Sequence, residues 1–123
     1  MSELILIIDT AHPTARVVLA DEEKMLAVKE WENTPKVGTD VLVYIDELLR
    51  DVGKAKADIT RVGVHAGPGS YALLRTGIGT ATILAQAIRA QLVAVDGETL
   101  EELVQSARTE GGVTSIKPKY GLV

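Results

Sequence analysis

The feature that most constrains the fold is a corner in residues 62–90, where an apolar run breaks at G-P-G and is followed at once by helical spacing. The run at 62–66 is typical of a buried strand, and the spacing at 70–89 predicts a helix. Proline restricts its own φ and the flanking glycines accept φ values that other residues resist, so 67–69 predict a tight turn. Ser70 is placed to cap the helix by accepting a hydrogen bond from a backbone N–H. A strand, a turn and a helix therefore follow one another here with almost no additional loop residues.

Hydrophobic periodicity predicts the remaining elements of an α/β fold. Strands are expected at 4–8, 15–20, 25–31, 62–66 and 91–95, and helices at 39–52, 70–89 and 99–107. Thr39 or Gly38 is expected to cap the first of these helices and Gly53 to end it, and Thr99 or Glu98 lies near the start of the last. The first three strands are joined by connections too short for a crossover and form an antiparallel meander, whereas the last two follow helices and run parallel. The order β-β-β-α-β-α-β-α predicts a five-stranded mixed sheet with three helices, the ribonuclease-H-like half-domain of actin-like ATPases. We expect this domain over residues 1–108 and a linker and tail over 109–123.

Length and composition exclude several classes of protein. A chain of 123 residues has room for one domain, and the absence of cysteine excludes disulfides and thiolate metal sites. The N-terminus has neither the basic region nor the cleavage site of a signal peptide, and no apolar run is long enough to span a bilayer. We therefore expect a cytoplasmic protein with no membrane partner. With 3% aromatic residues and a net charge of −4, the chain offers little general attraction for nucleic acid.

An anion site is one hypothesis for the corner. Residues 59–95 contain no Asp or Glu, and a glycine-rich turn before a helix presents free N–H groups at the positive end of the helix dipole. The end of the first strand is also where carboxylates of actin-like folds meet a metal–nucleotide. The candidate anion- or nucleotide-binding residues are Asp9, Thr10, Gly67, Gly69, Ser70 and Arg75. The alternative, weighed equally, is a turn that only lets the strand and the helix pack closely.

No catalytic set stands out in the sequence. His12 and His65 are far apart along the chain and lack the H-x-x-x-H or H-E-x-x-H spacing of a metal site. Each is interpreted as a surface residue or as one whose ring is satisfied within the fold. Neither a Ser/His/Asp set nor a carboxylate pair is evident, so we expect no metal site and no enzymatic activity.

The predicted helices allow both a packing and a partner interpretation. The second helix carries a row of small residues at Gly77, Ala81 and Ala85. Gly79 lies nearby, and a glycine inside a helix costs about 1 kcal/mol relative to alanine, which close packing on the sheet or on another helix would offset. Val43 and Tyr44 lie beside the main apolar stripe of 39–52. They indicate either a broad core face or a second surface for a partner.

The sequence resembles the TsaB (YeaZ) family in three segments, I-L-I-I-D-T at 5–10, I-D-E-L-L at 45–49 and, above all, G-P-G-S-Y-A-L-L-R-T-G-I-G-T-A at 67–81. The resemblance covers about residues 4–103 in order. It implies a non-catalytic scaffold subunit that supports threonylcarbamoyl transfer to adenosine of tRNA by binding a TsaD-like catalytic partner through its first two helices. A TsaE-like ATPase is implied as a further partner, with tRNA reached only indirectly and a homodimer formed when the chain is alone.

The same resemblance implies a partner interface formed by Val41, Tyr44, Leu48, Leu74, Gly77, Ile78, Ala81 and Ala85. The chain departs from the family at Y-A-L in 71–73, where the family has F-T-G, and at 109–123, which stand in place of the family's second actin-like half. A lobe that lacks this second half is expected to form no closed nucleotide cleft. We therefore expect no cofactor in this lobe, with ATP or ADP and Mg²⁺ only at an interface. The alternative function is a small actin-like module that binds a nucleotide or phosphate.

Overall fold

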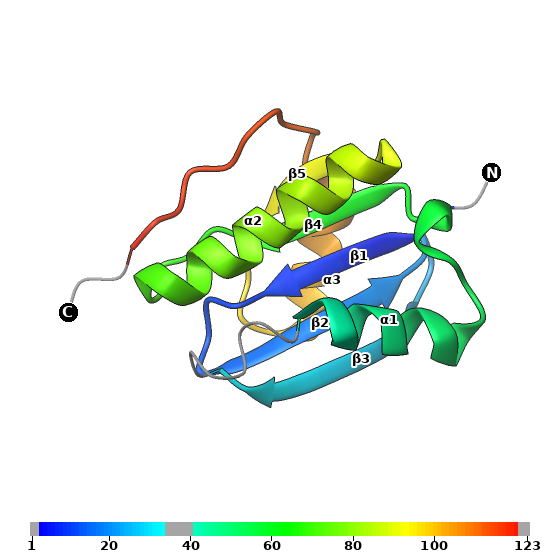
Figure 1. The fold of residues 1–123 in the computed structure, drawn as a ribbon, viewed down its shortest axis with the longest axis horizontal. Coiled ribbons are helices and arrows are strands. Elements are labelled where there is room, and N and C mark those ends of the chain that lie inside the picture. The colour runs from blue at the N-terminus through cyan, green and yellow to red at the C-terminus, as the bar shows by residue number, and fades with distance from the viewer. Residues whose placement is uncertain (1–2, 34–40, 121–123) are drawn as a thin grey trace.

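The computed structural model describes residues 3–33 and 41–120 as a mixed sheet with helices on both faces (Figure 1). The strands are β1 (Ile5–Asp9), β2 (Thr14–Ala20), β3 (Met25–Glu32), β4 (Arg61–His65) and β5 (Gln91–Val95). The helices are α1 (Val41–Val52), α2 (Tyr71–Ile88) and α3 (Leu100–Thr109), with a 3-10 turn η2 (Lys56–Asp58) before β4. This order of strands and α-helices confirms the predicted β-β-β-α-β-α-β-α pattern.

The five strands lie in the order β3-β2-β1-β4-β5. β1 pairs antiparallel with β2 and β2 antiparallel with β3, whereas β1 with β4 and β4 with β5 are parallel pairs. The meander and the two parallel strands are therefore as predicted. β1 is the central strand, and all of its residues are buried, which explains its uninterrupted apolar sequence.

Each face of the sheet has its own hydrophobic core. Helices α1 and α2 cover one face and α3 covers the other (Figure 1). Successive side chains of β1 alternate between the two cores: Leu6 and Ile8 pack with α1 and α2, and Ile5 and Ile7 pack with α3. Aliphatic side chains supply most of both cores, as expected for a chain without phenylalanine.

The helix ends follow the predicted capping residues. Ser70 accepts a hydrogen bond from the Leu73 N–H at the start of α2, and Thr99 forms a capping box with Glu102 at the start of α3. Gly53 follows the end of α1 with φ of 69°, a backbone conformation that glycine adopts without strain. The predicted cap of the first helix at Gly38 or Thr39 lies outside the described residues.

The segment after α3 runs back along the domain beside α2 (Figure 1). The Val113 N–H donates to the Leu92 carbonyl at 2.8 Å, and the Lys119 N–H donates to the Ala66 carbonyl at 2.7 Å. Ile116 packs against the core beneath α2. Residues 111–120, called the C-terminal segment below, thus cover the outer side of β5 and reach the corner before α2. In the part of the chain that is described, no helix combines the length and apolar character needed to cross a membrane.

Candidate functional site

Asp9 ends β1 as a fully buried carboxylate with several hydrogen bonds from its own chain. It accepts from the Ala11 N–H at 3.0 Å, from His12 Nδ1 at 2.6 Å and from Arg16 Nε at 3.0 Å. Arg16 is placed there by register, since it is the β2 residue that pairs with Asp9. A buried charge is tolerated only when it is paired and hydrogen-bonded, and here both conditions hold. The Asp9 carboxylate therefore stabilises the connection between β1 and β2.

His65 ends the neighbouring parallel strand β4 and is also buried. The Gly67 N–H donates to its Nδ1 at 3.0 Å, so its Nε2 carries the proton and donates to the Gly97 carbonyl at 3.1 Å. Burial lowers the pKa of His65, which favours this neutral form. Asp96 lies 3.6 Å from Nε2, but its side chain is almost fully exposed. The interpretation of His65 as a ring satisfied within the fold is confirmed.

The structure brings the two histidines together although they are far apart in sequence. Their rings meet edge to face, with centroids 4.9 Å apart. The cause is topological: β1 and β4 are adjacent parallel strands, so their carboxyl ends meet at one edge of the sheet. Motif spacing did not predict this pairing, because the two histidines belong to segments far apart in the sequence. The signal was that His65 lies at the end of one predicted strand and that His12 follows the end of another.

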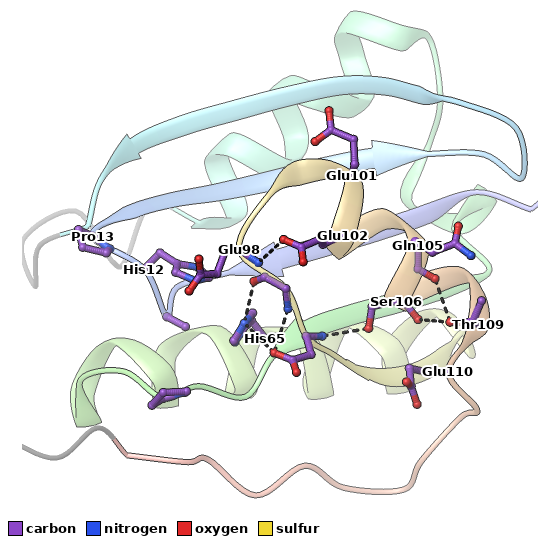
Figure 2. A pocket seen from close by; sticks show the side chains of 14 residues that line it. His12, Pro13, His65, Glu98, Glu101, Glu102, Gln105, Ser106, Thr109 and Glu110 are labelled. Atoms are coloured by element: carbon purple, nitrogen blue, oxygen red, sulfur yellow. Dashed lines mark hydrogen bonds and ion pairs between the residues drawn. The ribbon is translucent and has the colours of Figure 1, made fainter.

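An open groove of about 980 Å³ lies at this edge, between the histidines and α3 (Figure 2). Five of its fourteen lining residues are acidic: Asp96, Glu98, Glu101, Glu102 and Glu110. Glu102 is committed to the α3 cap, and the N–H groups of Thr99 and Glu98 that it accepts from lower its pKa. Within residues 3–33 and 41–120, no group of three or more His, Cys, Asp or Glu side chains is arranged to hold a metal ion.

The predicted anion corner is closely packed by other parts of the backbone. A side chain on Gly67 would overlap the Lys119 carbonyl oxygen, and a Cβ on Gly69 would lie 2.9 Å from the Ala11 carbonyl oxygen. Gly67 also has φ of 110°, in the region that favours glycine. Both glycines are thus required by close approach of neighbouring backbone. This observation favours the packing interpretation of the turn.

Thr10 and Arg75, the polar residues proposed to complete that corner, have partners elsewhere. The Thr10 hydroxyl donates to the Leu73 carbonyl at 2.7 Å and fills the space where a side chain on Gly77 would lie. The Arg75 guanidinium lies over the Tyr71 ring at 5.1 Å and donates to the Tyr71 hydroxyl. With Asp9 enclosed as well, these residues do not fit a metal–nucleotide, and anion binding at the corner stays a prediction.

The residues predicted to form the partner interface need to be reassigned. The structure buries all of them except Tyr44, which is half-buried and stacked on Trp31: Val41, Leu48, Leu74, Gly77, Ile78, Ala81 and Ala85. Their side chains form the inner apolar stripe of each helix and pack against the sheet. They are therefore part of the core of this chain and are not exposed to a partner. Gly77 in particular is required by Thr10.

Other residues form the outer surface of the same helices. Leu42 and Val43 on α1 are 49% and 53% exposed, and Ile83 on α2 is 69% exposed. Val43 lies off the main apolar stripe of the helix, as its position in the sequence predicts. The sequence pattern did not predict the exposure of Leu42 or Ile83, because a wide apolar stripe in a sequence has no sharp edge. The usable signal was a large apolar residue opposite the small-residue row.

Comparisons with known proteins support this architecture. A family model described as "TsaD: tRNA N6-adenosine threonylcarbamoyltransferase" matches residues 39–122. The "tRNA threonylcarbamoyladenosine biosynthesis protein TsaB" of Escherichia coli (strain K12) is 32% identical over 113 residues, 91% of this chain and 47% of that relative. The protein of the same name from Bacillus subtilis (strain 168) is 30% identical over 111 residues, 90% of this chain and 48% of that relative. The chain thus spans about half the length of the curated relatives it matches.

A solved structure shows the same fold. YeaZ from Pseudomonas aeruginosa superposes with a TM-score of 0.70 at 23% sequence identity, over 76% of this chain and 44% of that chain. With the sheet order, this likeness confirms the predicted actin-like half-domain.

Proposed function

This chain belongs to the family that the TsaD model describes, and within that family it is similar to the TsaB (YeaZ) proteins. We propose that it is a scaffold subunit in the formation of threonylcarbamoyladenosine on tRNA. In this proposal the chain binds a TsaD-like catalytic subunit through the outer surface of α1 and α2. A TsaE-like ATPase joins the same complex, and the chain alone forms a homodimer through the same helices.

The observation that carries the proposal is the exposed apolar surface of α1 and α2, defined by Leu42, Val43 and Ile83 and called the helix face below. Both helices cover the same side of the sheet, so one partner can contact both (Figure 1). Small residues beside Ile83 on α2, namely Thr76, Thr80 and Ala87, let a partner helix approach closely. Large apolar side chains exposed on helices that cover the same face of a sheet favour a protein–protein interface.

A scaffold role is further supported by how the polar residues at the sheet edge are used. Asp9 is bound to His12 and Arg16, and both nitrogens of His65 are hydrogen-bonded to backbone groups. A general base or nucleophile needs a free, oriented atom next to substrate. We therefore assign the chemistry of threonylcarbamoyl transfer to the partner.

The proposal includes no nucleotide bound at the end of β1. The actin-like fold implies ATP or ADP with Mg²⁺ near the end of β1, but Asp9 and Thr10 are engaged in internal contacts there. The start of α2 is capped by Ser70 and lies against the C-terminal segment at Tyr120. A nucleotide at the end of β1 would need further groups from a partner surface.

The test is co-purification with the TsaD-like subunit from the same organism. We expect Val43→Arg and Ile83→Arg each to reduce the recovered partner on the order of tenfold, because each places a charge in the centre of an apolar contact. The matched control is Gln105→Arg, an exposed residue of α3 on the opposite side of the sheet, which should leave recovery unchanged. Circular dichroism verifies that each variant folds. Folded helix-face variants that retain the partner would contradict the assignment.

Sedimentation of the chain alone tests the homodimer. The same two variants should convert it to a monomer, whereas Gln105→Arg should not. A monomer at all concentrations would remove the homodimer from the proposal without affecting the co-purification result.

A further inference from the structure

A small pocket of about 400 Å³ lies between α2 and the C-terminal segment, on the side of α2 that faces away from α1. It is lined by Arg75, Ile78, Gly79, Pro118 and Tyr120. The pocket is separate from the helix face and from the acidic groove, with which it shares no lining residue. Its walls combine an aromatic ring, an aliphatic floor and a guanidinium group.

The aromatic wall belongs to a stack of three side chains. The rings of Tyr71 and Tyr120 are stacked, with centroids 4.8 Å apart and planes 28° from parallel, and the Arg75 guanidinium lies over the Tyr71 ring. Tyr71 and Tyr120 are 57% and 45% exposed. These are two of the three tyrosines of the chain. An exposed, oriented ring offers a π-face on which a further planar group can stack.

Gly79 keeps the floor of the pocket open. A Cβ built on Gly79 meets no atom within 4 Å, so no contact within the described residues requires a glycine there. Glycine nevertheless costs helix stability relative to alanine. The contrast with Gly77, which Thr10 requires, indicates that Gly79 serves something outside the described fold.

The charge around the pocket is positive, although the chain as a whole carries −4. Neither residues 59–95 nor residues 111–123 contain an Asp or Glu. Arg75 lines the pocket, and Lys117 and Lys119 flank Pro118 in the C-terminal segment. In the described parts of the chain, the ion pairs include none of these three cations. No carboxylate in the described residues therefore neutralises them, and the Arg75 guanidinium has N–H donors beyond the one that it gives to the Tyr71 hydroxyl.

We propose that this pocket binds a nucleobase together with its phosphate. The base stacks on Tyr120 above Ile78 and Gly79, and Arg75 pairs with the adjoining phosphate. The same chemistry is offered by a single-stranded RNA segment and by a free nucleotide. Composition alone predicted little attraction for nucleic acid, but folding gathers the few aromatic and basic residues in one place. The proposal does not depend on the scaffold role, because it concerns a different surface.

The experiment measures binding of fluorescein-labelled decaadenylate RNA to the isolated chain by fluorescence anisotropy at low salt. We expect Tyr120→Ala and Gly79→Leu each to weaken binding about fivefold or more, because one removes the stacking surface and the other fills the floor. Leucine is a good helix former, so Gly79→Leu should keep the fold. Tyr120→Phe retains the ring and should retain binding. Arg75→Ala should weaken binding, and the matched control Arg50→Ala, an exposed arginine of α1, should not.

Competition identifies the source of the base. Displacement of the RNA by AMP or ATP supports the pocket as a free-nucleotide site, and failure of both to displace it supports an RNA site. The proposal is overturned by no RNA or nucleotide binding, or by binding that Tyr120→Ala and Gly79→Leu leave unchanged. Equal binding of labelled oligoglutamate with the same variant dependence would also overturn it, in favour of an acidic polypeptide. Helix-face variants should leave RNA binding intact, so the two proposals fail separately.

Discussion

The Thr10 hydroxyl occupies the space that a side chain on Gly77 would need, which fixes how closely α2 approaches the end of β1. The hydroxyl also donates to the Leu73 carbonyl at 2.7 Å, so the contact is both steric and polar. The small residue predicted to face a partner helix thus serves the internal packing of strand and helix. Gly79, two residues later, has no such neighbour. This contrast leads to the first prediction.

Gly77→Ala should lower the free energy of unfolding by about 1–3 kcal/mol, because the new methyl overlaps Thr10 in a packed core. Gly79→Ala is the matched control and should raise it by about 0.5–1 kcal/mol through helix propensity. Urea denaturation measures both. Equal effects at the two positions would show that Thr10 does not set the approach of α2.

Asp9→Asn should destabilise the fold by about 3–5 kcal/mol, because it leaves the Arg16 guanidinium without its buried anionic partner. The matched control is Glu47→Gln, which removes a partly exposed partner of Lys29 and should change stability by less than about 1 kcal/mol. Thermal and urea unfolding of both variants checks this difference. A mild effect of Asp9→Asn would mean that the buried network contributes little.

Leu74→Ala should lower the free energy of unfolding by about 2–5 kcal/mol, because the Leu74 side chain is fully buried between α2 and the sheet. Ile83→Ala on the same helix should change stability by no more than about 0.5 kcal/mol, because Ile83 is exposed. Denaturation therefore checks the reassignment of core and surface residues on α2. Similar costs for both would place Ile83 in a buried contact, as in a stable dimer.

Stability should fall as the pH drops below about 6.5, the ordinary pKa of histidine. Burial lowers the pKa of His65 in the folded chain, so the unfolded chain binds more protons below that pH, and stability rises with pH across the window. The loss levels off once the pH passes the folded-state pKa. His65→Asn can still accept from the Gly67 N–H but does not titrate.

Urea unfolding from about pH 7.5 down to about pH 5 tests this expectation. The variant should show a shallower decline than the natural sequence over that window. The slopes should converge above about pH 7, where His65 is neutral in both states. Identical slopes throughout would assign the pH dependence to other groups.

Much of the fold was predictable from local signals. Ser70, Thr99 and Gly53 mark helix ends through hydrogen bonds and backbone angles that involve only neighbouring residues. The short connections between the first three strands left an antiparallel meander as the only arrangement. The candidate site was less predictable, since its contacts join residues from different elements.

Two features of the structure could not be predicted from local sequence patterns. The inner and outer residues of α2 are both apolar or small, so the sequence does not separate Leu74 from Ile83. His12 and His65 share no motif and meet only because β1 and β4 are neighbours in the sheet. Both features concern which face or which neighbour a residue has, and neither concerns the type of element.

The sequence by itself determined the order of the elements, their ends and the tight corner at residues 67–70, because these depend on backbone preferences and on periodicity within a few residues. Only the tertiary structure decided the uses of Gly77 and Gly79, the partners of Asp9 and the gathering of Tyr71, Arg75 and Tyr120. Those outcomes depend on which strands become neighbours and on where the C-terminal segment returns, and such long-range contacts are set by the packing of the whole chain.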